Sequence, residues 1–120
     1  MSGYGRARIV EALDTVEGIN GHASAPDSPV AGDAWPRWVI ARYGGKLALT
    51  MLNEYDVLAI LPAGYSPTTV EQADGLLPML SAALAKVGTL TSAEPVSIQV
   101  ADSSTMPGLR IRMTPREATR

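Results

Sequence analysis

An alternating apolar run, followed by a second apolar pattern with helical spacing, constrains the fold of this chain more than any other feature. The run extends from Leu49 to Leu61 and ends at Pro62. Alternation with a period of two is typical of a strand that buries one face. The apolar residues of segment 67–87 recur every three or four positions, which predicts a helix with one apolar stripe. Together the two segments predict a strand–turn–helix unit.

The predicted helix over Pro67–Val87 has two possible starts and one disruption. Either Ser66 caps it with a proline at its first position, or Thr68 opens a capping box. Pro78 lies inside the helix, where proline removes a backbone donor and clashes with the carbonyl group four residues earlier. We therefore expect a kink or a break near Asp74–Gly75.

The remaining segments predict one more helix and several strands. A helical apolar pattern covers residues 6–16 and stops at Gly18. The Gly44–Gly45 pair predicts a hairpin turn, and a change of phase near Leu52–Asn53 predicts a bulge or a bend in the long strand. The expected strands are 19–23, 35–43, 46–61, 96–100 and 109–113.

This order of elements predicts the α+β class. We expect a mostly antiparallel sheet of four to five strands packed against two helices, with a long irregular loop or arm after the first helix. Residues 1–114 should form one domain and residues 115–120 a flexible C-terminal tail. If the second face of the sheet is also apolar, another chain has to cover it.

The composition argues against several classes of function. The chain has 120 residues, no cysteine and a net charge of −2, which excludes disulfides and thiolate metal sites and disfavours a general nucleic-acid binder. Arg110 and Arg112 alternate with apolar residues, as on the solvent face of a strand. The N-terminus lacks the apolar core of a signal peptide, and no run is long enough to span a membrane. We expect synthesis in the cytoplasm and no membrane partner.

Residues with catalytic potential are few. His22 shares a loop with Ser24, Asp27, Ser28 and Asp33, so a nucleophile, a base and an acid can be named on paper. A loop rich in glycine and proline does not hold such groups with the precision that catalysis needs. A single histidine with dispersed aspartates is also a poor metal site. We therefore expect no enzymatic activity, no catalytic residue, no metal and no cofactor.

Two carboxylates stand apart on the long predicted strand. Glu54 and Asp56 share one of its faces, at the end opposite two aliphatic residues. Acid–base chemistry would need a partner group that the sequence does not supply. We expect this pair to be solvated or to face a lumen.

The most distinctive short motif contains both tryptophans. Trp35-Pro36-Arg37-Trp38 combines residue types that dominate interface hot spots, and the same types anchor loops to small cores. We expect Trp35 to be the contact residue and Trp38 to lie in the core. The preceding segment, Ser24–Ala34, is either an extended arm or lid or a surface loop. Our candidate interface residues are Pro26, Pro29, Trp35 and Arg37.

Several motifs together resemble one family. They are Val-Glu-Gly-Ile at residues 16–19, Ala-Gly-Asp-Ala-Trp-Pro-Arg-Trp at 31–38, Val-Leu-Ala-Ile-Leu-Pro at 57–62 and Glu-Pro-Val at 94–96. Over roughly residues 6–113 the pattern resembles the tail terminator, or tail-completion, proteins of long-tailed bacteriophages, especially those that infect actinobacteria. The Gly-Asp-Ala-Trp-Pro block is its most specific part.

The resemblance implies a structural protein of the virion. Such proteins form six-membered rings at the head-proximal end of the tail, where they stop growth of the tail tube and meet the head–tail connector. The implied partners are therefore further copies of this chain, the tail tube protein and the connector or adaptor protein. Genomic DNA passes through the ring without specific binding, and Glu54 and Asp56 would face that channel.

Two other functions stay open at this point. A head–tail connector adaptor, of the stopper or completion type, has a similar size and is hard to separate from a terminator by sequence. A small hydrolase or ligand-binding domain that uses His22 belongs to a different class.

Overall fold

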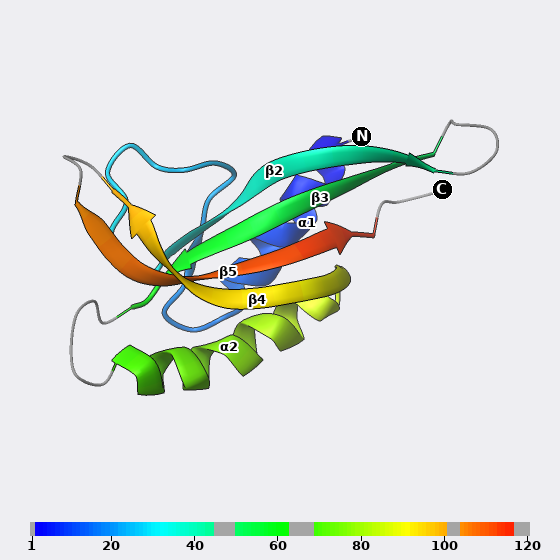
Figure 1. Ribbon diagram of the computed structural model, residues 1–120. Coiled ribbons are helices and arrows are strands. Elements are labelled where there is room, and N and C mark those ends of the chain that lie inside the picture. The colour runs from blue at the N-terminus through cyan, green and yellow to red at the C-terminus, as the bar shows by residue number, and fades with distance from the viewer. Residues whose placement is uncertain (1, 45–49, 63–68, 101–103, 117–120) are drawn as a thin grey trace.

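The computed structural model describes residues 2–44, 50–62, 69–100 and 104–116. Two helices and five strands follow one another in the expected order, with the short first strand inside the long loop region (Figure 1). Their bounds are α1 Ser2–Asp14, β1 Asn20–Gly21, β2 Asp33–Gly44, β3 Thr50–Ile60, α2 Thr69–Ala85, β4 Gly88–Gln99 and β5 Thr105–Pro115.

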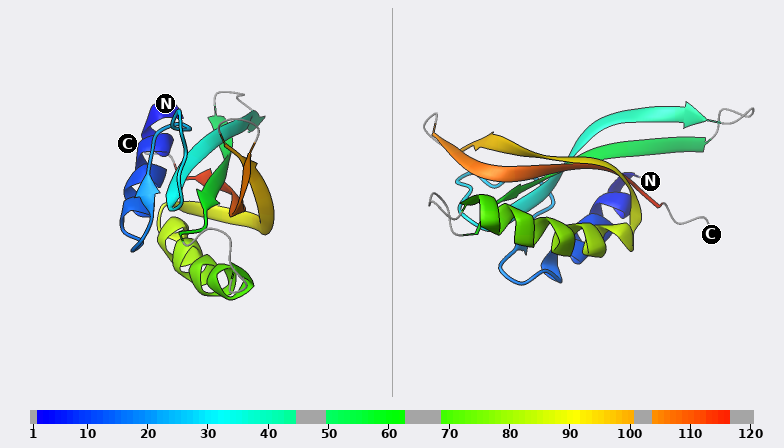
Figure 2. Two further views of the ribbon diagram at one scale, coloured as in Figure 1. Left: turned by 90° about the vertical axis from the view of Figure 1, so that its left-hand side faces the viewer. Right: turned by 60° about the horizontal axis from the view of Figure 1, so that its bottom comes forward.

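The five strands form one sheet in the order β1-β2-β3-β5-β4. Only the two-residue β1 runs parallel to its neighbour, and the other three ladders are antiparallel. Both helices lie on the same side of this sheet (Figure 2). The predicted α+β class, with a mostly antiparallel sheet against two helices, is confirmed.

The main core lies between the helices and one face of the sheet, which we call the helix face. Strand alternation sends Tyr55, Val57 and Ala59 of β3 to this face, as their spacing predicted. The matching apolar stripe of α1 contributes Ile9 and Leu13. All five side chains are almost fully buried. Burial of this apolar surface is the main term that stabilises the fold.

The helix ends follow local chemistry. Gly18 has a φ of +85° and terminates the turn after α1, as predicted. We expected a kink or a break near Asp74–Gly75, and the break is wrong because α2 runs continuously through Pro78. Pro78 and Asp74 both lie on the exposed side of α2. Water can therefore reach the carbonyl group that loses its hydrogen bond, which explains why the proline is tolerated.

The opposite side of the sheet, which we call the open face, carries no helix. The sheet curls strongly there, so that Trp35 of β2 and Ile98 of β4 join one small apolar cluster although their strands lie three places apart. Bulges in β2, at Val39, and in β4, at Thr91, accompany the curl. The phase change expected at Leu52–Asn53 is instead located in the partner strand, opposite Glu54 and Tyr55.

The end of the chain corrects another expectation. Pro115 is buried and pairs with Gly88 in the sheet, and the N–H of Arg116 donates to the carbonyl of Val87 at 2.7 Å. The predicted free tail therefore does not begin at residue 115. Residues 117–120, the Gly45 side of the predicted hairpin turn, and the caps at Ser66 and Thr68 lie outside the described residues.

Candidate functional site

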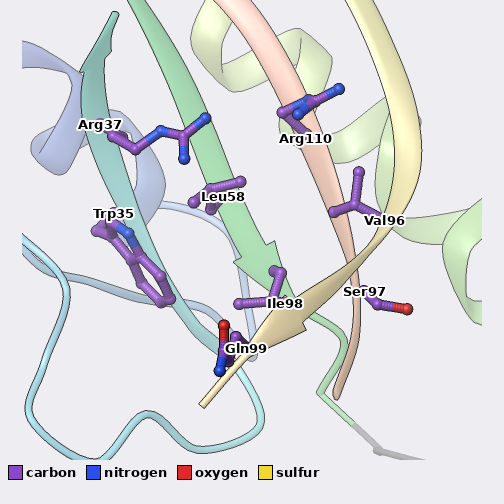
Figure 3. Close-up of a pocket in the computed structure, with 8 residues that line it drawn as sticks. All are labelled: Trp35, Arg37, Leu58, Val96, Ser97, Ile98, Gln99 and Arg110. Atoms are coloured by element: carbon purple, nitrogen blue, oxygen red, sulfur yellow. The ribbon is translucent and has the colours of Figure 1, made fainter. Parts of the chain in front are cut away.

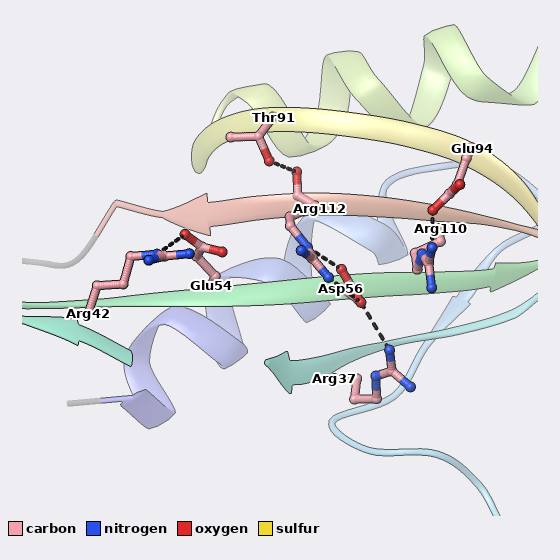
Figure 4. A network of polar contacts seen from close by, with 8 residues as sticks. All are labelled: Arg37, Arg42, Glu54, Asp56, Thr91, Glu94, Arg110 and Arg112. Atoms are coloured by element: carbon pink, nitrogen blue, oxygen red, sulfur yellow. Dashed lines mark hydrogen bonds and ion pairs between the residues drawn. The ribbon is translucent and has the colours of Figure 1, made fainter. Parts of the chain in front are cut away.

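The open face carries a row of ion pairs that crosses four strands (Figure 4). At its centre the side chain of Asp56 on β3 has no exposed surface. Arg37 on β2 donates to its Oδ2 at 3.0 Å, and Arg112 on β5 donates to Oδ1 at 2.8 Å and Oδ2 at 3.1 Å. These residues are direct cross-strand partners, Arg37 opposite Asp56 and Asp56 opposite Arg112. The register of the strands therefore brings these three side chains together.

The two arginines keep Asp56 ionised. Burial opposes its charged form, but the hydrogen bonds and charges of Arg112 and Arg37 outweigh burial and hold the pKa of Asp56 below its ordinary value. In return, the hydrogen bond to Asp56 raises the pKa of Arg112. The cluster contains two arginines and one carboxylate, so both oxygens of Asp56 accept hydrogen bonds from cations and the arrangement fits a structural role.

Two further pairs flank the cluster. Arg42 donates to Glu54 at 2.7 Å on one side, and Arg110 pairs with Glu94 on the other. All four arginines of the row keep at least a third of their side chains exposed. The open face therefore presents a belt of guanidinium groups above a buried carboxylate.

A hollow of about 330 Å³ lies beside this belt, where the end of β4 bends over the open face (Figure 3). The apolar floor includes Trp35 and Leu58, and Arg37 and Arg110 stand on one side of it. Gln99 and the Val96–Ile98 segment form the other side. Arg110 binds Glu94, and Arg37 shares the carboxylate of Asp56 with Arg112.

The structure corrects the expected placement of Glu54 and Asp56. Both lie on the open face, as the alternation predicted, but Asp56 is buried and neither carboxylate is free of a cation. The expectation of a solvated pair is therefore wrong for Asp56, and a position facing a channel stays a prediction. The signal that sequence reasoning missed was Arg112, whose polar-face position was known but whose register opposite Asp56 was not.

The tryptophans exchange their expected roles. Trp35 is only 5% exposed and packs with Ile60 and Ile98, whereas Trp38 is 51% exposed. The two side chains lie on opposite faces of β2, and Trp38 stands at the outer edge of the helix face, opposite Tyr55, where the β3–β5 ladder begins. Its indole Nε1 donates to Oδ1 of Asn53 at 3.0 Å.

Segment 24–34 is held to its own chain. The backbone N–H of His22 donates to the carbonyl of Ala34 at 2.8 Å, and the N–H of Gly32 donates to the carbonyl of Ile60 at 3.1 Å. Nε2 of His22 lies 3.0 Å from Oδ1 of Asp33, whose Oδ2 accepts from the N–H of Val30 at 2.9 Å. The loop is therefore tied down at both ends and is not an extended arm.

The His22–Asp33 contact explains the histidine without catalysis. The described hydrogen bonds of the pair go to each other and to the loop backbone, and none reaches Ser24 or Ser28. The carboxylate of Asp33 thus fastens the loop, and the described contacts of His22 do not include the serines that could be named on paper as nucleophiles.

The other candidate interface residues lie at the surface. Pro26 and Pro29 are half-buried in the loop, and Arg37 is exposed above Asp56. These placements are compatible with a partner contact, which remains a prediction.

Sequence reasoning missed a projecting element. β3 pairs with β5 only from Tyr55 onwards, whereas the β2–β3 ladder continues to Gly44 opposite Thr50. Residues 40–44 and 50–54 therefore form a two-stranded extension, which we call the arm (Figure 2). Ile40 and Leu52 on the arm are 40% and 45% exposed. The sequence signal that could have revealed the arm was the difference in expected length between neighbouring strands.

Among the described residues, no group of three or more histidine and acidic side chains is placed to hold a metal ion. Neither helix, over the ranges that the structure describes, combines the length and apolar character that a membrane span requires. No protein family model matches the chain, and no curated protein matches it.

Proposed function

We propose that this protein is a structural component of a bacteriophage tail, a terminator that forms a ring at the head-proximal end of the tail tube. The observation that carries the proposal is the arm, which projects beyond the point where β3 pairs with β5 and exposes large apolar side chains. Two-stranded ribbons are marginally stable in water, so such an element gains most when a partner covers it.

The rest of the molecule supports a role based on shape. One sheet face is covered by the chain's own helices, and the charged groups of the other face are paired with one another. The sequence resemblance to tail terminators adds the specific place of assembly. In this proposal the ring binds the end of the tail tube on one side and the connector on the other.

Tube capping tests the proposal. A tail tube protein from the same genome is polymerised with and without this chain, and tube lengths and ends are measured by electron microscopy. We expect shorter tubes that carry a ring at one end. A ring that binds the connector but leaves tube length unchanged would favour the adaptor function, and tubes that never bind the chain would contradict the terminator function.

A further inference from the structure

The arm presents a mixed apolar and charged surface on the open face. Ile40 lies opposite Glu54, and Arg42 lies opposite Leu52, so that the four side chains form one small patch. Arg42 keeps 62% of its side chain exposed, although it binds Glu54. The patch thus consists of two exposed aliphatic groups with a guanidinium between them.

A complementary socket lies between the first half of α2 and the β4–β5 ladder. These elements are at the end of the molecule opposite the arm (Figure 1). The volume of the socket is about 240 Å³, larger than the roughly 150 Å³ apolar cavity that is known to bind benzene in another protein. The lining is mostly apolar and includes Leu61, Ala73, Leu77 and Leu109. Among the described residues that line the socket, Asp74 is the charged one, and its side chain is exposed.

The two surfaces match in chemistry but cannot meet within one chain, because they lie at opposite ends of the same rigid sheet. A patch and a socket at different places on one subunit produce a head-to-tail contact, which closes into a ring when the rotation per subunit allows it. The guanidinium of Arg42 matches the carboxylate of Asp74 in charge.

We propose that the arm of one copy docks into the α2/β4–β5 socket of a second copy, with Leu52 in the hollow and Arg42 facing Asp74. The inference rests on the proposed ring and names the surfaces that build it. Edge-to-edge strand pairing is the competing mode, but Pro95 in the middle of the outer strand β4 lacks an N–H and interrupts that edge.

Disulfide trapping tests this contact directly, because the chain has no cysteine of its own. Leu52→Cys and Ala73→Cys are combined in one chain, and both sites tolerate a small side chain at a partly exposed position. Under mild oxidation we expect a ladder of covalent oligomers that ends at the ring size. A mixture of the two single variants should stop at covalent dimers. The control chain carries Leu52→Cys with Ser28→Cys, which lies in the exposed loop.

The mass of the chain in solution distinguishes a failure of the arm–socket contact from a failure of the ring proposal. If the uncrosslinked double variant forms rings but gives no more covalent product than the control, the arm–socket contact is wrong and the ring proposal survives. If the native chain stays monomeric with and without tail tube protein, both proposals are wrong.

Charge reversal gives a second readout: Arg42→Glu should weaken association about tenfold or more, and Asp74→Lys in the same chain should restore it. Failure of that restoration would contradict the Arg42–Asp74 pairing.

Discussion

At the scale of single residues, Asp56 shows how a buried charge is accommodated in a small sheet. Its three charge-assisted hydrogen bonds come from two arginines on neighbouring strands. Such bonds are about twice as strong as neutral ones, and a buried carboxylate without them would be costly. The cluster therefore fixes the register of β2, β3 and β5 as well as stabilising them.

Asp56→Asn tests this role. The neutral amide turns two donors toward two guanidinium groups, so we expect the free energy of unfolding at pH 7 to fall by about 1–3 kcal/mol. The matched change Glu54→Gln acts on an exposed pair and should cost less than about 1 kcal/mol. Urea unfolding followed by circular dichroism measures both.

The contribution of Asp56 to the free energy of unfolding should depend on pH, and the same variant measures this dependence. The arginines hold the folded pKa of Asp56 below its ordinary value, whereas the unfolded carboxyl titrates near about 3.9. Between these two values the unfolded state binds more protons, so the stabilisation is complete above the unfolded pKa and is lost as the pH falls through the folded pKa. The difference between wild type and Asp56→Asn should therefore shrink on acidification below about pH 4. An unchanged difference between pH 7 and pH 3 would speak against the ion-pair cluster.

At the scale of elements, two glycines allow the loop to return to the sheet. Gly32 has a φ of +91°, and an added Cβ would lie 2.6 Å from the backbone carbonyl oxygen of Gly18. Only glycine fits this crossing without moving the backbone. The crossing places Asp33 where it can fasten the loop and start β2.

We expect Gly32→Ala to lower the free energy of unfolding by more than about 1 kcal/mol, because both the φ and the carbonyl contact oppose a side chain. Gly75→Ala is the matched control: a Cβ at this helical position meets nothing within 4 Å, and alanine should stabilise α2 by about 0.5–1 kcal/mol. Thermal unfolding of both variants gives the comparison. Equal effects of the two substitutions would show that the crossing is not tight.

The elements also show how far sequence reasoning reaches here. Period and turn chemistry predicted both helices, the strand order along the chain and the buried face of β3, because these depend on local patterns. The bulge at Val39 could not be located, since a phase change is shared by two paired strands and the sequence shows it in only one. The burial of Trp35 and the partners of Asp56 were missed for a different reason: both depend on the packing and register of segments that are distant in the sequence.

At the scale of the whole molecule, different surfaces of the chain have different roles. The helix face supplies the core, the open face pairs its carboxylates with arginines, and the arm and the socket are the surfaces that we propose for contact with other chains. Two different contact surfaces on one small subunit are what a closed head-to-tail ring requires. The proposed terminator role depends on this division.

The solution mass of the native chain tests this claim most directly. Native mass spectrometry at micromolar concentration should find a discrete closed oligomer, six copies by the family resemblance, for the wild type and for the exposed-loop control Ser28→Asp. Leu52→Asp, which puts a charge on the arm, should be monomeric at the same concentration. A wild-type chain that stays monomeric at every concentration, with or without tail tube protein, would contradict the account.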